Sequence, residues 1–259
     1  MGTDETQNGP SLLERVDLAL ASHLAAAAGN AEPLATAQRV LDRVRRPMPS
    51  DARFVASLLR LRGFFIDDDD AIDVAEGRTG RLTPITQEYR LLRGLLECLK
   101  LVRARATAGK VPDAWFLVEL FRAMTAELPR FRNNDLRRGP PWDALIYVNY
   151  PPADQLRSLI DTFDVQHNFR DMAQIFRRLH PVRQGFRLLW RFVRIAPFPD
   201  FNTVIGWLGL NAWLLTKGYP LLHSAPGDHE LLARLAGGPP PTKIVQFEAR
   251  LLAAVDERL

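Results

Sequence analysis

Cysteine and long apolar runs are scarce in this chain of 259 residues. The single cysteine, Cys98, excludes an internal disulfide bond and fits a reducing compartment. Because Cys98 lies in an apolar helical run, we expect a buried thiol without a catalytic role. No apolar stretch reaches the about twenty residues that cross a bilayer, and residues 1–10 lack the basic-then-apolar order of a signal peptide. These absences predict a cytoplasmic protein that does not bind membranes.

Lysine is also scarce, since only four of the 34 basic residues are lysines. The net charge of +4 and the pI of about 9.6 would suit a nucleic-acid partner. The arginines, however, are scattered over nearly every predicted helix and alternate with Asp and Glu. This distribution is typical of solvated helix faces and not of a stripe that follows phosphates, so we expect no nucleic-acid partner.

Strand patterns are rare, whereas helical spacing of apolar residues extends through most of the chain and predicts an all-α fold. A helical extension (1–48) precedes a core (49–236), and a linker with a terminal helix (237–259) follows. The expected helices occupy residues 12–28, 33–44, 51–62, 86–106, 113–128, 153–163, 168–179, 181–194, 202–215 and 242–259, with shorter ones after the acidic run 67–70 and from 228.

Two short segments allow more than one interpretation. Residues 144–150 are rich in β-branched and aromatic side chains and end at a double proline, which predicts a strand. The four aspartates at 67–70 could hold a metal, but they also suit the start of a helix, where carboxylates complement the dipole. We favour the helix start and expect no metal site.

The stretch 195–220 determines the architecture. A proline-containing turn with a possible N-cap at Asp200 or Asn202 leads into an almost wholly apolar run that ends at Lys217 and Gly218. A helix that is apolar on every face belongs in the interior, so we expect it at the centre of the domain.

This stretch resembles the signature of the Fic (Fido-fold) family, H-P-F-x-D/E-G-N-G-R-x-x-R followed by an apolar helix ending in G-Y-P. The resemblance extends upstream to His180, which precedes Pro181, and covers about the last half of the chain. It implies a helical Fic-like domain with a small β-hairpin flap at 144–150 that either covers a pocket or pairs with a target peptide. The positions that match the signature are Pro197, Phe198, Asp200, Asn202, Asn211, Gly218, Tyr219 and Pro220.

The residues that carry the family's AMP transfer from ATP differ here. Ala196 stands at the catalytic histidine and has no group for proton transfer. Phe201 and Thr203 replace two glycines and would crowd a phosphate. Val204 and Trp207 replace two arginines that neutralise phosphate oxygens. We therefore expect no AMP transfer, and we regard a residual nucleotidyl transfer as the least favoured function.

An upstream segment fits this interpretation. In many Fic proteins a motif resembling S-x-x-I-E-G carries a glutamate that folds over the ATP site and inhibits it. Here Gly63 matches the glycine of that motif, and Arg62 stands in place of the glutamate. An inhibitor of ATP chemistry would have no use in a chain without that chemistry.

Four of the replacements, Ala196, Phe201, Val204 and Trp207, are apolar, which suggests that the nucleotide site has become an apolar pocket for an organic molecule, with no cofactor. That molecule could be bound only, or transformed by cyclisation, dehydration or group transfer. Asp200 and His180 are the candidate acid and base, and the candidate contacts are Ala196, Phe198, Phe201, Asn202, Thr203, Trp207, Arg194 and Tyr147.

The alternative is an inactive Fic-like protein that binds a protein partner through its flap and N-terminal helices. In that case Phe201 and Trp207 fill the former ATP site as core. A pocket of about 300 Å³ or more beside Ala196 would favour the small molecule, whereas solid packing there would favour the protein partner.

Overall fold

The computed structural model describes residues 49–236, apart from Thr79, Asn134, Tyr147 and residues 164–180. The helices expected at 12–28, 33–44, 168–179 and 242–259 lie outside the described residues, as do the candidate site residues His180 and Tyr147.

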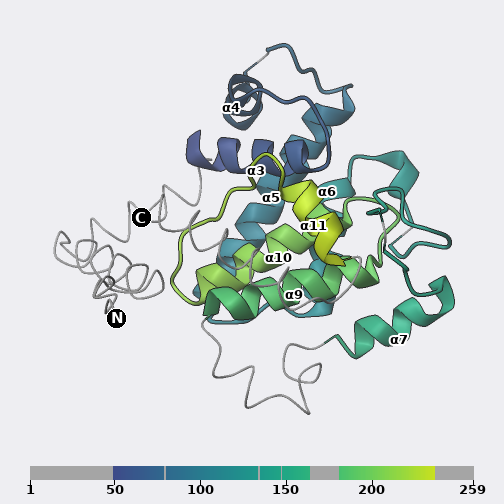
Figure 1. Cartoon of the computed structure of the whole chain (residues 1–259). Helices are drawn as coiled ribbons and strands as arrows, with labels where there is room; N and C mark the ends of the chain where they lie inside the picture. The colour runs from purple at the N-terminus through teal and green to yellow at the C-terminus, as the bar shows by residue number, and fades with distance from the viewer. Residues whose placement is uncertain (1–48, 79, 134, 147, 164–180, 237–259) are drawn as a thin grey trace, which may run out of the picture.

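Helix α10 (Asn202–Thr216) forms the centre of the described fold (Figure 1). Every residue from Asn202 to Leu214 is buried, as the apolar run predicted. Its most extensive contacts are with α9 and α5, and α3 and α6 also touch it. Because full burial of one large apolar side chain contributes about 1.5–3 kcal/mol, this helix is a major source of stability. The four surrounding helices are α3 (Pro49–Leu61), α5 (Gln87–Thr107), α6 (Ala114–Thr125) and α9 (Pro181–Ile195).

The helix ends follow the local sequence signals. The hydroxyl of Thr86 accepts a hydrogen bond from the backbone N–H of Tyr89 at 3.4 Å and caps α5. The carboxylate of Asp113 accepts one from Phe116 N–H at 2.8 Å and caps α6. Gly218 has φ 85°, so it adopts the left-handed conformation that we predicted after the central helix.

Shorter elements complete the described part of the chain. The acidic run begins helix α4 (Asp68–Glu76), where Asp70 accepts a hydrogen bond from Asp67 N–H, so the helix-start interpretation is confirmed. None of the described helices combines the length and apolar character needed to cross a membrane. The remaining elements are η1 (Pro129–Phe131), η2 (Ala153–Gln155), α7 (Leu156–Asp161) and α11 (Asp228–Ala236).

The strand predicted at 144–150, and with it the β-hairpin flap, is not formed by the described residues of that segment. They make turns and irregular backbone instead. Leu145 N–H donates to the Tyr150 hydroxyl at 2.9 Å, and Val148 N–H donates to Leu145 O at 3.3 Å. These local bonds turn the chain and occupy groups that a strand would offer to a neighbour, so local turn formation overrides the β propensity of the residues.

Candidate functional site

The loop between α9 and α10 has the left-handed backbone that glycine favours, although two non-glycine residues occupy it. Phe201 has φ 63°, and Ala196 has φ 41°. Side chains in this region cost about 1–2 kcal/mol per residue because Cβ approaches the backbone. Phe201 stands where the Fic signature has glycine, so the backbone keeps a glycine-like turn while a phenyl ring replaces the open space.

Asp143 occupies the N-terminus of α10. Its carboxylate accepts hydrogen bonds from Asn202 Nδ2 at 2.8 Å and from Thr203 N–H at 3.3 Å. The first N–H groups of a helix attract anions, and here a buried carboxylate of the same chain meets them. Burial raises the pKa of Asp143, while its bond to Asn202 opposes the rise.

Asp200 does not cap α10 in the way the sequence suggested. Residue 201 takes the N-cap position, and the Asp200 carboxylate accepts from Phe201 N–H at 2.7 Å. It also accepts from Arg62 Nε at 2.7 Å, and an Arg130 nitrogen lies 3.7 Å away. Asp200 is buried, so it is a neutralised anchor and not a free acid or base.

Asn202 does not cap α10 either, since it is the first helical residue, and its side chain closes the loop instead. Its Oδ1 accepts from Phe198 N–H at 2.9 Å, and its Nδ2 donates to Phe198 O at 3.0 Å. Together with the bond to Asp143, these contacts give hydrogen-bond partners to both the oxygen and the nitrogen of the Asn202 side-chain amide.

Arg137 holds the other end of the loop. Its buried guanidinium donates to Ala196 O at 2.7 Å, Pro151 O at 2.6 Å and Gly139 O at 2.9 Å. Burial lowers the pKa of Arg137. The carbonyl of Ala196 follows the C-terminus of α9, where a cation complements the helix dipole. The segment 137–143 therefore places a positive charge after α9 and a negative charge before α10.

The candidate contact residues come together, but they are covered. Ala196, Phe198, Phe201, Asn202, Thr203 and Trp207 are each at most 2% exposed. Phe198 stacks on Phe121 with ring centroids 4.3 Å apart, and Trp207 Nε1 donates to Leu222 O at 2.8 Å. Among the candidate contacts that the structure describes, Arg194 alone keeps accessible surface, and its guanidinium lies 4.7 Å from the Trp190 ring. A ligand could not touch the six buried residues unless the loop moved.

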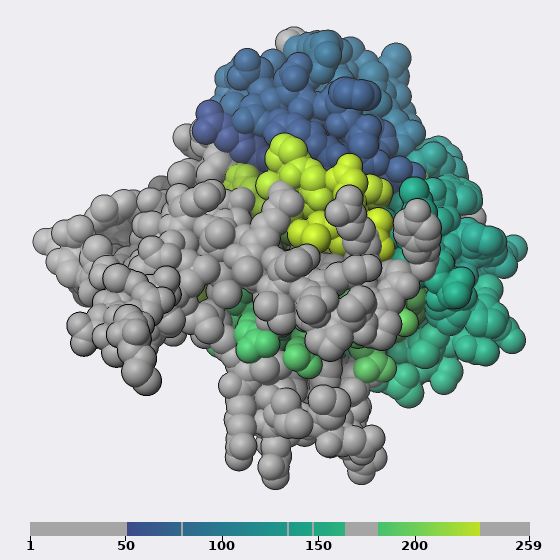
Figure 2. All heavy atoms as spheres, viewed as in Figure 1, coloured from purple at the N-terminus to yellow at the C-terminus, as the bar shows by residue number. Residues whose placement is uncertain are grey.

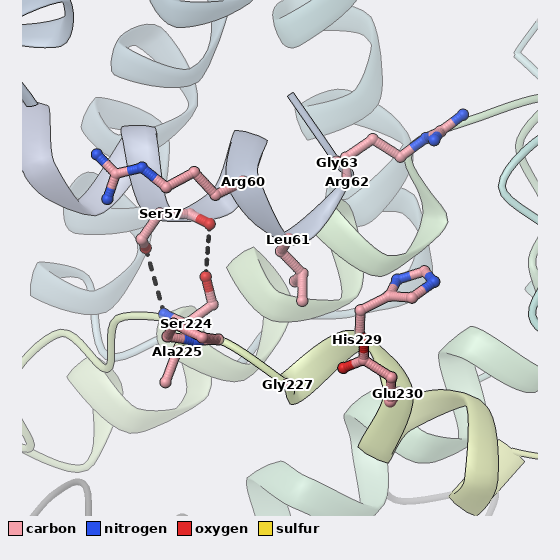
Figure 3. Close-up of a pocket in the computed structure, with 11 residues that line it drawn as sticks. Ser57, Arg60, Leu61, Arg62, Gly63, Ser224, Ala225, Gly227, His229 and Glu230 are labelled. Atoms are coloured by element: carbon pink, nitrogen blue, oxygen red, sulfur yellow. Dashed lines mark hydrogen bonds between the residues drawn. The ribbon is translucent and has the colours of Figure 1, made fainter. Parts of the chain in front are cut away.

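A cavity of about 460 Å³ lies elsewhere, between the end of α3 and residues 224–230 (Figure 3). Leu61 and Gly63 line it from one side, and Ala225, Pro226 and His229 line it from the other. Its volume falls within the about 300–1,000 Å³ of small-molecule sites. Arg62 belongs to both regions, because it lines the cavity and bonds to Asp200 in the loop.

Sequence reasoning missed the two charged residues that hold the loop. Arg137 and Asp143 lie about sixty positions before their partners, and no local pattern links them to the loop. Arg62 was singled out as the replacement for the inhibitory glutamate, and its contact with Asp200 confirms that this position reaches the loop.

Comparison with known protein structures agrees with the fold that the sequence resemblance implied. No family model matches the chain, and no curated protein matches it. A Fic domain containing signaling protein from Bacteroides thetaiotaomicron superposes with a TM-score of 0.71 at 16% identity, covering 95% of this chain and 94% of that one. Two further structures agree. Fic-1 from C. elegans gives a TM-score of 0.67 at 14% identity over 95% of this chain and 69% of the other. A Fic family protein from Desulfovibrio desulfuricans gives 0.60 at 15% identity over 98% and 75%.

The chain has the Fic fold. The sequence resemblance covered about half of the chain, whereas the structural likeness extends over nearly all of it. At 14–16% identity the likeness concerns the backbone, so the chemistry of this Fic-fold protein must be argued from its own loop.

Proposed function

We propose that this Fic-fold protein does not transfer AMP and acts as a protein-binding module. The single observation behind the proposal is the covered, internally neutralised loop at residues 196–203. It favours the second of the two interpretations drawn from the sequence, because packed side chains occupy the place where a small molecule was expected.

The groups that AMP transfer would need are absent from the loop or already engaged. Ala196 offers no base. Asp143 occupies the N-terminus of α10, where a phosphate would otherwise benefit from the helix N–H groups. Arg62 is paired with Asp200. A triphosphate entering this loop would meet two buried carboxylates, which argues against nucleotide binding there.

The segment 129–150 supplies a surface suited to a protein partner. Trp142 is 58% exposed and Ile146 is 68% exposed. The acidic residues of this segment are Asp143, which is buried, and Asp135, which pairs with Arg122. Arg132 and Arg138 are exposed, so the surface is apolar and basic. Tryptophan and arginine are the residues most enriched at binding hot spots, and the charge favours a partner segment that carries acidic residues.

This surface is attached firmly to the loop. Trp142 N–H donates to Pro199 O at 2.7 Å, and Arg137 N–H donates to Pro197 O at 2.9 Å. The Arg130 guanidinium lies 5.6 Å from the Trp142 ring. A surface fixed in this way loses little conformational entropy on binding. The loop would then support a docking face instead of binding a nucleotide.

The test uses two matched pairs of surface substitutions. The double variant Trp142→Ser, Ile146→Ser removes the proposed anchors, and Phe65→Ser, Ile85→Ser removes two residues that are 95% and 82% exposed on other loops. Proteins captured from cell extract by the wild type should be lost with the first pair and retained with the second. Loss of about 2 kcal/mol at a hot spot corresponds to about a thirtyfold weaker Kd. Equal capture by both double variants would refute the proposal.

The absence of AMP transfer is tested with labelled ATP. Neither the wild type nor Ala196→His should label a protein, because restoring a base leaves Asp143 and Asp200 in place. Transfer by the single variant, above that of a heat-treated control, would show that the loop still accepts a nucleotide.

A further inference from the structure

We infer that the cavity between α3 and residues 224–230 is a binding site for an uncharged, largely apolar organic molecule, separate from the loop. Its volume of about 460 Å³ suits a small organic ligand. The inference does not depend on the protein-binding role, because the proposed docking residues Trp142 and Ile146 do not line the cavity.

The arginines of the cavity wall already have partners for their charges. In Figure 3 the side chains of Arg60 and Arg62 extend to opposite sides, away from Leu61 and His229. Arg60 Nε donates to Ile66 O at 2.7 Å, and the same guanidinium pairs with Asp68. Arg62 Nε is held by Asp200. Both guanidinium groups are therefore already paired, and the aliphatic parts of these long side chains can serve as apolar surface.

The serines of the wall are engaged with each other. Ser224 Oγ donates to Ser57 O at 2.6 Å, and Ser224 N–H donates to Ser57 Oγ at 3.2 Å. Ser57 Oγ donates in turn to Phe54 O at 2.7 Å. These bonds fix the segment after α10 against α3, where Figure 2 shows the two in contact. A ligand that needed either hydroxyl would have to break an existing bond.

The remaining lining is mostly apolar and carries one carboxylate. Leu61, Gly63, Ala225 and Pro226 contribute carbon surface and backbone, the exposed Glu230 adds a negative charge, and His229 adds an imidazole whose buried Nδ1 has no hydrogen-bond partner among the described residues. A phosphate or sulfonate entering the cavity would lose hydration, would find both arginines already paired with Asp68 and Asp200, and would face the Glu230 carboxylate. The preferred ligand is therefore a neutral molecule with a largely apolar surface.

The test compares two dyes that differ in one charged group. N-phenyl-1-naphthylamine is neutral, and 8-anilino-1-naphthalenesulfonate is its sulfonated relative. Fluorescence titration of the full chain should give saturable binding of the neutral dye, at least about tenfold tighter than the sulfonate, which corresponds to about 1.4 kcal/mol. ATP should not displace the neutral dye. Equal or tighter binding of the sulfonate, or displacement by ATP, would overturn the inference.

Location is tested by filling the cavity. Ala225→Trp should weaken the neutral dye at least tenfold, and Ala126→Trp, at an exposed position in the turn after α6, should not. Glu230→Gln, also at an exposed position, should strengthen the sulfonate and leave the neutral dye unchanged, which provides a test even where Ala225→Trp fails to fold. Unchanged affinities in both cavity variants would place the dye elsewhere and refute the site. The double variant Trp142→Ser, Ile146→Ser should bind the neutral dye as the wild type does, because its substitutions lie outside the cavity. Failure of the cavity proposal can therefore be distinguished from failure of the protein-binding proposal.

Discussion

The loop at 196–203 and the cavity beside α3 both contain charged side chains, but the loop is filled and the cavity is open. In the loop, Arg137 and Asp143 point inward and satisfy helix ends and backbone carbonyls, so polar bonds and aromatic rings fill the space. In the cavity, Arg60 pairs with Asp68 and Arg62 pairs with Asp200, and the space between them and residues 224–230 stays open. A sequence motif identifies where a functional loop lies in the fold, but the partners of the nearby charges decide whether a ligand has room.

The largest expected effect tests the filled loop through its aromatic ring. Phe201→Ala removes a completely buried side chain and should lower the free energy of unfolding by about 3–5 kcal/mol in urea titrations. Because φ is 63°, Phe201→Gly should be about 1 kcal/mol more stable than Phe201→Ala. Gly63→Ala, at φ 96°, is the matched control and should be destabilising by a similar amount. If the glycine variant at 201 is the less stable one, the left-handed geometry carries no strain.

The second prediction concerns the charge that holds the end of α9. Arg137→Ala leaves buried carbonyls without a donor and should cost about 3 kcal/mol or more, measured by chemical denaturation. Arg138→Ala removes an exposed neighbour with the same charge and should change stability by less than about 0.5 kcal/mol. Equal effects of the two variants would mean that net charge, and not the inward bonds, stabilises the loop.

A smaller effect is expected at the wall of the cavity. Ser224→Ala removes the hydrogen bond from the Ser224 hydroxyl to Ser57 O and should lower the free energy of unfolding by about 1 kcal/mol, measured by urea titration. Ser158→Ala, on the exposed side of α7, serves as the control. No difference between these two variants would show that the segment after α10 is held to α3 by apolar packing alone.

The smallest effect is a pH dependence at Asp143. Burial raises its pKa in the folded state above the unfolded value, so the folded state holds the proton more tightly. The stabilisation from this group is complete below the unfolded pKa and is lost as pH rises through the folded pKa. The free energy of unfolding of the wild type should therefore fall relative to Asp143→Asn as pH rises through that window. The free energy of unfolding of both proteins is measured by urea titration in matched buffers. A difference between them that stays constant with pH would contradict the raised pKa of Asp143.

Much of the fold followed from local signals. The start of α6 at Asp113, the end of the central helix at Gly218 and the wholly buried α10 were predicted from residue type and spacing, and α5 begins one residue after the predicted start at Thr86. The strand at 144–150 was not found, because bonds within the segment outweigh its composition.

The site was harder to predict than the fold. The sequence predicted Phe198, Phe201 and Trp207 as contacts of an open pocket, whereas all three are buried: Phe198 stacks on Phe121, and Trp207 bonds to the backbone of Leu222. Burial depends on partners such as Phe121 and Asp143, which the chain brings from distant positions. The cavity depends likewise on Ser57 and Ser224, which are 167 residues apart.

Arg62 joins the two regions, since it forms part of the cavity wall and holds Asp200 in the loop. Thermodynamic linkage is reciprocal: a cavity ligand that changes the strength of the Arg62–Asp200 pairing changes partner affinity by the same factor by which the partner changes ligand affinity. If both molecules bind as proposed, this one side chain would let the binding of the first be sensed by the second.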